Sequence, residues 1–157
     1  MESWEEIVED ILKSEGGLTR DHAGLTNFGI VAGQYSGLTE DEIENLTRDQ
    51  AKEWYTKHFY SKLKRIPRHL LHIVIDFAVN SGISRSIKTL QKAANYFHQA
   101  NIAEDGLIGP NTLRWAEWVS AGEFRQLRFQ FYEELVEKNP EKYGRFRSGW
   151  LRRCMRV

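Results

Sequence analysis

Two carboxylates beside a cluster of glycines are the residues of this sequence best suited to chemistry. Glu15 is followed by Gly16 and Gly17, and Asp21 comes six positions after Glu15 in a polar, glycine-rich segment. Hydrolysis of a glycosidic bond needs such a pair: one carboxylic acid protonates the leaving oxygen, and one carboxylate serves the water or the cation. Glycines also let a ligand approach the backbone closely. The segment therefore indicates a glycoside hydrolase site.

The surroundings of the two carboxylates favour different roles. Glu15 follows a stretch rich in Trp and Ile, whereas Asp21 lies among polar residues and glycines. Apolar walls favour the protonated form of a carboxyl group, and wet, hydrogen-bonded surroundings favour the ionised form. We therefore expect Glu15 to be the proton donor and Asp21 the anion.

Motifs for other chemistries are absent. The sequence has no phosphate-binding loop, dinucleotide fingerprint, zinc-protease motif or serine-hydrolase elbow. His69 and His72 are three positions apart on an expected helix, but no third metal ligand is near them in the sequence. Cys154 is the only cysteine, so no internal disulfide can form. We predict that the protein uses no metal and no cofactor.

An amphipathic helix is expected to carry Glu15. Apolar residues from Trp4 to Leu12 follow the i, i+3, i+4 rule, which predicts a helix over residues 3–14 that stops at the paired glycines. Residues 18–37 lack this period and contain glycines at regular intervals, which favours a small β-hairpin or an irregular loop.

The remainder of the sequence predicts helices. Capping-box patterns begin at Thr39 and Thr47, and Pro110 has the position favoured at a helix start. The most apolar segment is expected to be the central buried helix. The expected helices are a short one after Thr39, then 47–60, 68–80, 84–101, one from Pro110, one from Ser120 to Lys138 and a short terminal pair. The fold class is mainly α with a small insert after the first helix.

Size and charge limit the classes of protein. A chain of 157 residues with 41% hydrophobic and 28% charged residues is typical of a soluble globular domain or of two small lobes. Its apolar runs are far shorter than the roughly 18 residues of a membrane span, so we expect no membrane insertion. Residues 1–60 have a charge balance of −8 and residues 61–157 one of +8. The basic half, including an arginine-rich terminus, either attracts a polyanion or is a solvated face that balances the acidic half.

Several ordered motifs resemble the N-acetylmuramidases of glycoside hydrolase family 108, the enzymes of phage endolysins, followed by their predicted peptidoglycan-binding module. The resemblance covers nearly the whole chain. It rests on Glu15-Gly16-Gly17, Leu25-Thr26-Asn27-Phe28-Gly29-Ile30, Trp54-Tyr55, His58-Phe59-Tyr60, Asp76-Phe77-Ala78-Val79-Asn80-Ser81-Gly82, Leu90-Gln91-Lys92-Ala93, Asp105-Gly106-Leu107-Ile108-Gly109-Pro110-Asn111-Thr112-Leu113 and the tail from Asn139 to Arg153. It implies a lysozyme-like helical fold, with a catalytic lobe over residues 1–84 and a peptidoglycan-binding-like lobe over residues 85–157.

The resemblance also implies residue roles. The catalytic glutamate of the family falls on Glu15, the threonine that holds the attacking water on Thr26, and an acidic residue on Asp21, within a loop about three residues shorter than usual. Candidate substrate-binding residues are Asn27, Tyr55, Phe59, Tyr60 and Asn80. The aromatic residues among them could stack on sugars or belong to the core, and Asn80 could serve structure instead.

The expected function is that of an endolysin-type muramidase. Such an enzyme hydrolyses the β-1,4 bond between N-acetylmuramic acid and N-acetylglucosamine in peptidoglycan and lyses the cell. Two alternatives stay open: a lytic transglycosylase acting on the same bond, and a non-catalytic helical module that binds wall polymer or nucleic acid. For the enzyme we expect a monomer with peptidoglycan, and not nucleic acid, as its partner. The resemblance implies accumulation in the host bacterial cytoplasm and release through a holin-like pore.

Overall fold

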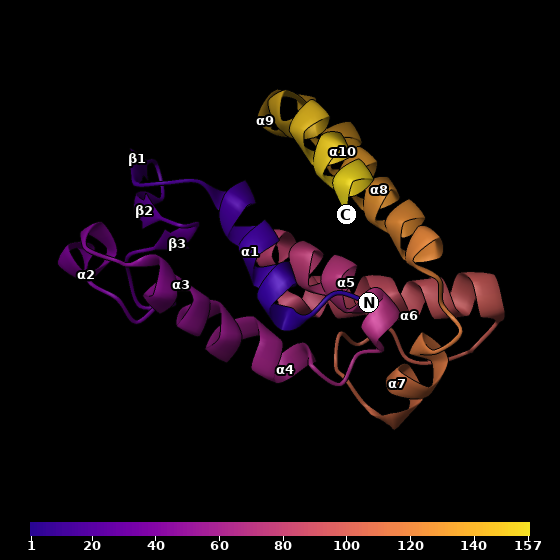
Figure 1. The fold of residues 1–157 in the computed structure, drawn as a ribbon. Helices are drawn as coiled ribbons and strands as arrows, with labels where there is room; N and C mark the ends of the chain where they lie inside the picture. Colours follow the sequence, from indigo (N-terminus) through magenta and orange to yellow (C-terminus); the bar gives the residue numbers. More distant parts are fainter. The chain divides into compact units, whose positions relative to one another are not determined.

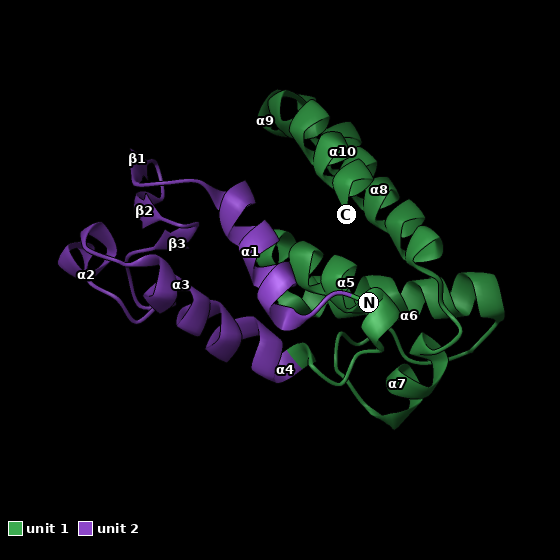
Figure 2. Ribbon diagram, viewed as in Figure 1, with its two compact units in different colours: residues 1, 63–157 green, residues 2–62 purple.

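The computed structural model describes all 157 residues and divides them into two compact units (Figure 2). One unit contains residues 2–62, and the other contains residues 63–157 together with Met1. This division follows packing and falls before the helix over residues 68–81. A functional boundary between residues 84 and 85 stays a prediction.

The unit of residues 2–62 combines helices with a small antiparallel sheet (Figure 1). The sheet follows the first helix, as the lack of helical periodicity predicts. The elements are α1 (Trp4–Glu15), β1 (Thr19–Asp21), β2 (Gly24–Asn27), β3 (Ile30–Val31), α2 (Glu40–Glu44), α3 (Arg48–Tyr55), the π-helical η1 (Thr56–Tyr60) and α4 (Ser61–Leu63), which ends one residue beyond this unit.

Helix α1 is anchored by its apolar face and stopped at Gly16. Ile7 and Ile11, one turn apart, are both fully buried, as the periodicity predicts. At the start of α1 the side chains of Ser3 and Glu6 form a capping box. At its end Gly16 has a φ of 79°, a left-handed value that terminates helices. This geometry makes Glu15 the last residue of a firmly packed helix.

The sheet has the order β1-β2-β3, and tight turns set its register. Asp21 pairs with Gly24 at the first turn, and Asn27 pairs with Ile30 at the second. The two residues of the second turn, Phe28 and Gly29, have φ values of 51° and 76°. Two positive φ values in a two-residue loop are the hallmark of a type I′ hairpin, whose twist matches that of the strands. Gly29 is therefore part of the turn geometry.

The helix predicted over residues 47–60 changes its form at Thr56. It begins with the expected capping box of Thr47 and Gln50, runs as α3 to Tyr55 and continues as a π-helical turn to Tyr60. Thr56 Oγ1 donates a hydrogen bond of 2.8 Å to the carbonyl oxygen of Lys52. Such a side chain competes with the backbone for the i−4 carbonyl, and this gives the local widening a physical cause.

The unit of residues 63–157 is helical throughout. Its core includes Phe77, which contacts Phe124, Phe131 and Tyr132 with ring centroids 5.5–6.0 Å apart. The expected starts at Pro110 and Ser120 are confirmed. The elements are α5 (Arg68–Ser81), α6 (Ile83–His98), α7 (Pro110–Ala116), α8 (Ala121–Lys138), α9 (Pro140–Tyr143), the 3₁₀ turn η2 (Gly144–Phe146) and α10 (Arg147–Arg156).

A buried charge cluster joins α5, α8 and α10. Asp76 is completely buried and accepts hydrogen bonds from Arg128 at 2.7 Å and from Arg153 at 3.0–3.1 Å. Burial alone would raise the pKa of Asp76, but the two guanidinium groups outweigh it and lower that pKa below its ordinary value. Arg153 is thus part of the interior, whereas the sequence placed it in an exposed basic tail.

The loop between α6 and α7 is organised by one buried amide. Gln91 Nε2 donates to Asp105 Oδ1, the Leu107 carbonyl oxygen and Thr112 Oγ1 at 2.9–3.0 Å, and Gln91 Oε1 accepts from the Gly106 amide. The whole amide is therefore satisfied within the protein. This network gives residues 105–112 a structural role.

Candidate active site

Glu15 and the turn after β2 meet in close contact. Glu15 Oε1 is buried, although the residue as a whole is half-buried. A β-carbon placed on Gly29 would lie 2.7 Å from Glu15 Cβ and 2.8 Å from both Glu15 Oε2 and Tyr55 Oη. Only a glycine fits there, so the backbone of the turn lies directly against the carboxylate.

Tyr55 holds this turn in place. It is 1% exposed and donates a hydrogen bond of 2.7 Å from its hydroxyl to the carbonyl oxygen of Phe28. The same hydroxyl would contact any side chain at Gly29. Tyr55 was predicted as a substrate-binding residue, and the structure places it behind the turn, where it positions Gly29 beside Glu15.

Thr26 lies two residues before the turn, on β2, where it pairs with Thr19 on one side and Val31 on the other. Its Oγ1 is buried and makes no hydrogen bond within the protein. A buried hydroxyl without a partner costs about 1–3 kcal/mol, and such groups concentrate where a ligand or water supplies the missing bond. A hydroxyl both donates and accepts, so this one suits a bound water.

Asp21 and Asn27 take different positions on the sheet. Asp21 is exposed at the tip of the β1–β2 hairpin, where its Oδ1 accepts a hydrogen bond of 2.8 Å from the Ala23 amide. Asn27 is 7% exposed, and its Nδ2 donates a hydrogen bond of 3.1 Å to the Ile43 carbonyl oxygen, which connects β2 to α2. These contacts give both residues a structural role, and their roles in catalysis and in substrate binding stay predictions.

The remaining predicted binding residues are spread over the fold. Phe59 is 5% exposed and belongs to the core, and Tyr60 is half-buried and stacks on Trp4 with ring centroids 4.7 Å apart. Asn80 lies in the other unit, on α5, where its Oδ1 accepts a hydrogen bond from the Tyr132 hydroxyl. The structure thus brings Glu15, Gly29 and Tyr55 into contact, and Thr26 lies on the strand that leads into the turn at Gly29.

Sequence reasoning overlooked the role of Gly29, although its position in a two-residue turn between short apolar strands carried the signal. No group of three His, Cys, Asp or Glu side chains is close enough together to hold a metal ion. None of the helices has both the length and the apolar character needed to cross a membrane.

Comparisons with known proteins found a family model and solved structures to which this chain is similar. Residues 8–82 match the family model described as glycosyl hydrolase 108, and this span contains Glu15, Thr26, Gly29 and Tyr55. The structure of Brucella abortus SagA is similar over 98% of this chain and 90% of its own, with a TM-score of 0.78 and 25% sequence identity. No curated protein matches the sequence.

The similarity of the complete chain confirms a lysozyme-like, mainly helical fold with a small sheet. The predicted C-terminal peptidoglycan-binding module lies outside the matched residues and stays a prediction. Residues 8–82 are similar to glycosyl hydrolase family 108, and this similarity supports a glycoside hydrolase that degrades peptidoglycan.

Proposed function

We propose that this protein is a muramidase that hydrolyses the β-1,4 bond between N-acetylmuramic acid and N-acetylglucosamine. The observation that carries the proposal is the contact of the Glu15 carboxylate with the turn at Gly29. The strand that leads into this turn carries the unpartnered hydroxyl of Thr26. A proton-donating carboxyl group is one member of the pair that glycosidic hydrolysis requires, and Asp21 is the candidate for the other.

In this mechanism Glu15 is the general acid. It donates its proton to the glycosidic oxygen as the bond to the anomeric carbon breaks. A water molecule held by Thr26 Oγ1 attacks that carbon from the opposite face, which inverts its configuration. Asp21 is the candidate base for this water, and its exposed position on a hairpin makes it the part of the machinery with the least support from the surrounding structure.

Replacing Glu15 by Gln tests the proposal. Glu15→Gln keeps the shape of the side chain but removes the proton donor, which contributes about 10²–10⁴-fold in rate to general acid catalysis. We expect loss of wall lysis, measured as turbidity of a suspension of cell walls, with an unchanged helical circular dichroism spectrum. The matched control is Glu5→Gln, an exposed glutamate on the same helix. Lysis by Glu15→Gln at a rate close to that of Glu5→Gln would contradict the assignment.

Mass spectrometry of the released fragments separates the two enzymatic alternatives. A muramidase adds water and leaves reducing ends, whereas a lytic transglycosylase leaves 1,6-anhydro ends, which are lighter by one water. We expect reducing ends. Anhydro ends would keep Glu15 as the acid but replace the water-based mechanism. A non-catalytic binding module would instead release no fragments and retain strongly salt-dependent binding.

The biological setting follows from the same proposal. We infer an endolysin that collects in the host cytoplasm as a monomer, is released through a holin-like pore and acts on the wall without a nucleic-acid partner. Residues 85–157 would contribute wall binding. The test is pelleting of the compact unit of residues 63–157 with purified walls, compared with the complete chain. This unit keeps Asp76 together with Arg128 and Arg153.

A further inference from the structure

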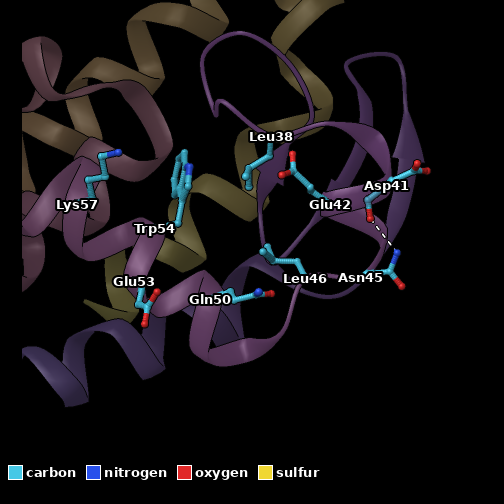
Figure 3. Close-up of a pocket in the computed structure, with 9 residues that line it drawn as sticks. All are labelled: Leu38, Asp41, Glu42, Asn45, Leu46, Gln50, Glu53, Trp54 and Lys57. Atoms are coloured by element: carbon cyan, nitrogen blue, oxygen red, sulfur yellow. Dashed lines mark hydrogen bonds between the residues drawn. The ribbon is translucent and has the colours of Figure 1, made fainter.

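An open groove of about 530 Å³ lies between α2 and α3, within residues 2–62. Its apolar side chains are Leu38, Leu46 and Trp54, and in Figure 3 they surround one open space, with Gln50 and Glu53 along its lower side. The indole of Trp54 is held in place, because its Nε1 donates a hydrogen bond of 3.0 Å to the Ser36 carbonyl oxygen. The groove is therefore preformed and has an apolar floor.

The groove belongs to a different face of α3 from the candidate active site. Gln50, Glu53 and Trp54 follow the i, i+3, i+4 spacing of one face of α3, and Lys57 follows them on η1. Tyr55, which contacts the turn beside Glu15, is the next residue after Trp54 and so is rotated by roughly 100° around the helix axis. The groove thus opens away from the side of α3 that Tyr55 presents to Glu15.

Charges of both signs line the groove. Carboxylates come from Glu42 and Glu53, whereas Figure 3 shows that of Asp41 directed away from the open space, and the only cation is Lys57. The pKa of Glu42 is lowered by its hydrogen bonds with Thr39 at the start of α2, so this carboxylate stays ionised. Glu53 on α3 and Lys57 on η1 are four positions apart, and no ion pair joins them, so each charge is available to a ligand.

We propose that this groove binds the peptide stem of peptidoglycan and recognises the free amino group of its diamino acid. The inference rests on the proposed action on peptidoglycan, which supplies such a peptide. A stem peptide carries methyl groups, carboxylates and one side-chain amine. The methyl groups match the apolar floor of Leu38, Leu46 and Trp54. The carboxylates match the ammonium of Lys57, and the amine matches the carboxylate of Glu53.

A sugar fits the groove less well. Flat stacking on a pyranose needs an open aromatic face, but the Trp54 ring is already stacked on His58, with centroids 4.0 Å apart and an interplanar angle of 18°. The ring also meets Tyr55 edge-on at 5.2 Å. Trp54 therefore contributes apolar area more than a stacking platform. The excess of two carboxylates, those of Glu42 and Glu53, over the one ammonium of Lys57 favours a ligand with an amine.

The test uses the soluble tetrapeptide N-acetyl-L-Ala-γ-D-Glu-L-Lys-D-Ala, whose only free amine is that of lysine, as the probe on the complete chain. Nuclear magnetic resonance titration follows the indole N–H signal of Trp54. The same titration is repeated on the Glu15→Gln variant, which is expected to be inactive. We expect the tetrapeptide to shift this signal. Acetylation of its lysine amine, or Glu53→Lys, should weaken binding about tenfold or more, because a charge-assisted hydrogen bond is lost. The matched control Glu44→Gln, an exposed carboxylate of α2 outside the groove, should bind as the parent does.

Three outcomes would overturn the inference. Equal binding of the acetylated peptide would show that the amine is not recognised, and a shift caused only by N-acetylglucosamine oligomers would make the groove a sugar site. A shift caused by protein concentration alone would indicate a second copy of this chain. Should Glu53→Lys not fold, Glu53→Gln replaces it. Wall lysis is measured separately: its absence with retained tetrapeptide binding contradicts the muramidase, while lysis without such binding contradicts only the groove.

Discussion

At Gly29 the lack of a side chain lets the turn after β2 lie against Glu15. The residue combines a φ of 76° with three atoms of Glu15 and Tyr55 within 2.8 Å of where a β-carbon would be. These are two independent reasons for glycine, one from backbone conformation and one from space. Substitutions at glycines that share the positive φ but not the crowding can therefore separate an effect on stability from an effect on activity.

We expect Gly29→Ala to reduce wall lysis far more than its cost in stability explains. The left-handed backbone costs roughly 1–2 kcal/mol with a β-carbon, and the added methyl group must also displace the Glu15 carboxylate. A displacement of about 1 Å can lower a rate by 10²-fold. Lysis rate and urea unfolding measure the two effects.

Gly37→Ala is the control for that substitution. Gly37 has a similar φ of 73°, but nothing lies within 4 Å of where its β-carbon would be. It should lose a similar amount of unfolding free energy and keep its activity. Equal loss of lysis in both variants would show that backbone strain alone is responsible.

For Thr26 we predict a substitution that raises stability while it lowers activity. Its buried Oγ1 has no protein partner, so Thr26→Val removes an unsatisfied polar group. We expect the unfolding free energy to rise by about 1 kcal/mol, or roughly 2–4 °C in melting temperature, while turnover falls and wall binding is retained. Thermal unfolding and lysis kinetics provide the measurements. A variant that is both less stable and fully active would assign Thr26 a structural role.

At the scale of elements, the buried cluster of Asp76, Arg128 and Arg153 fixes α10 against α5 and α8. Arg128 also lies over the rings of Phe77 and Tyr132, at 5.0 and 5.8 Å from their centroids, and its Nε and Nη1 make no hydrogen bond. Two guanidinium groups share one carboxylate, so loss of Asp76 would leave two cations buried without a counter-charge.

Asp76→Asn should therefore destabilise the protein by about 3–5 kcal/mol at neutral pH. The pKa of Asp76 is lowered in the folded state, so its contribution is present above the ordinary pKa near 3.9 and is lost as pH falls below it. Urea unfolding over a range of acid pH should show the difference between the variant and the parent shrinking below about pH 4. The exposed Glu137→Gln on α8 is the control, and a difference independent of pH would contradict the ionised form of Asp76.

At the scale of the whole molecule, charge is divided between the two units. Residues 63–157 contain 16 basic and 9 acidic residues, whereas residues 2–62 contain 6 basic and 13 acidic ones. The basic unit of residues 63–157 attracts anionic wall polymers, and the acidic unit of residues 2–62 does not. The groove of α2 and α3, with its carboxylates, lies in the acidic unit, which agrees with an amine-bearing ligand there.

Wall binding by the complete chain should fall steeply with salt, because the screening length shrinks from about 30 Å at 0.01 M to about 3 Å at 1 M. Pelleting with purified walls measures it. The double variant Arg145→Ala and Arg152→Ala removes two exposed cations and should weaken both binding and its salt dependence. Arg153 is unsuitable for this test because it holds Asp76. An unchanged salt response in the double variant would show that the terminus is only a solvated face.

Local patterns in the sequence determined most of the elements. The apolar spacing of α1, the capping boxes at Thr39, Thr47 and Ser120, and Pro110 at a helix start all depend on residues within one or two turns. The carboxylate at the end of α1 was found in the same way, because the glycines after Glu15 stop the helix next to it.

Contacts between distant residues were decided only by the tertiary structure. The bond from Tyr55 to Phe28 spans 27 positions, and that from Arg153 to Asp76 spans 77. Sequence periodicity records which face of a helix is apolar, but not which distant atoms that face meets. For this reason the sequence left Tyr55 open between sugar stacking and the core, and it did not distinguish Arg153 from the other arginines of the terminus. Folding placed Tyr55 behind the turn at Gly29 and Arg153 on a buried carboxylate, because most polar groups that are removed from water find a partner.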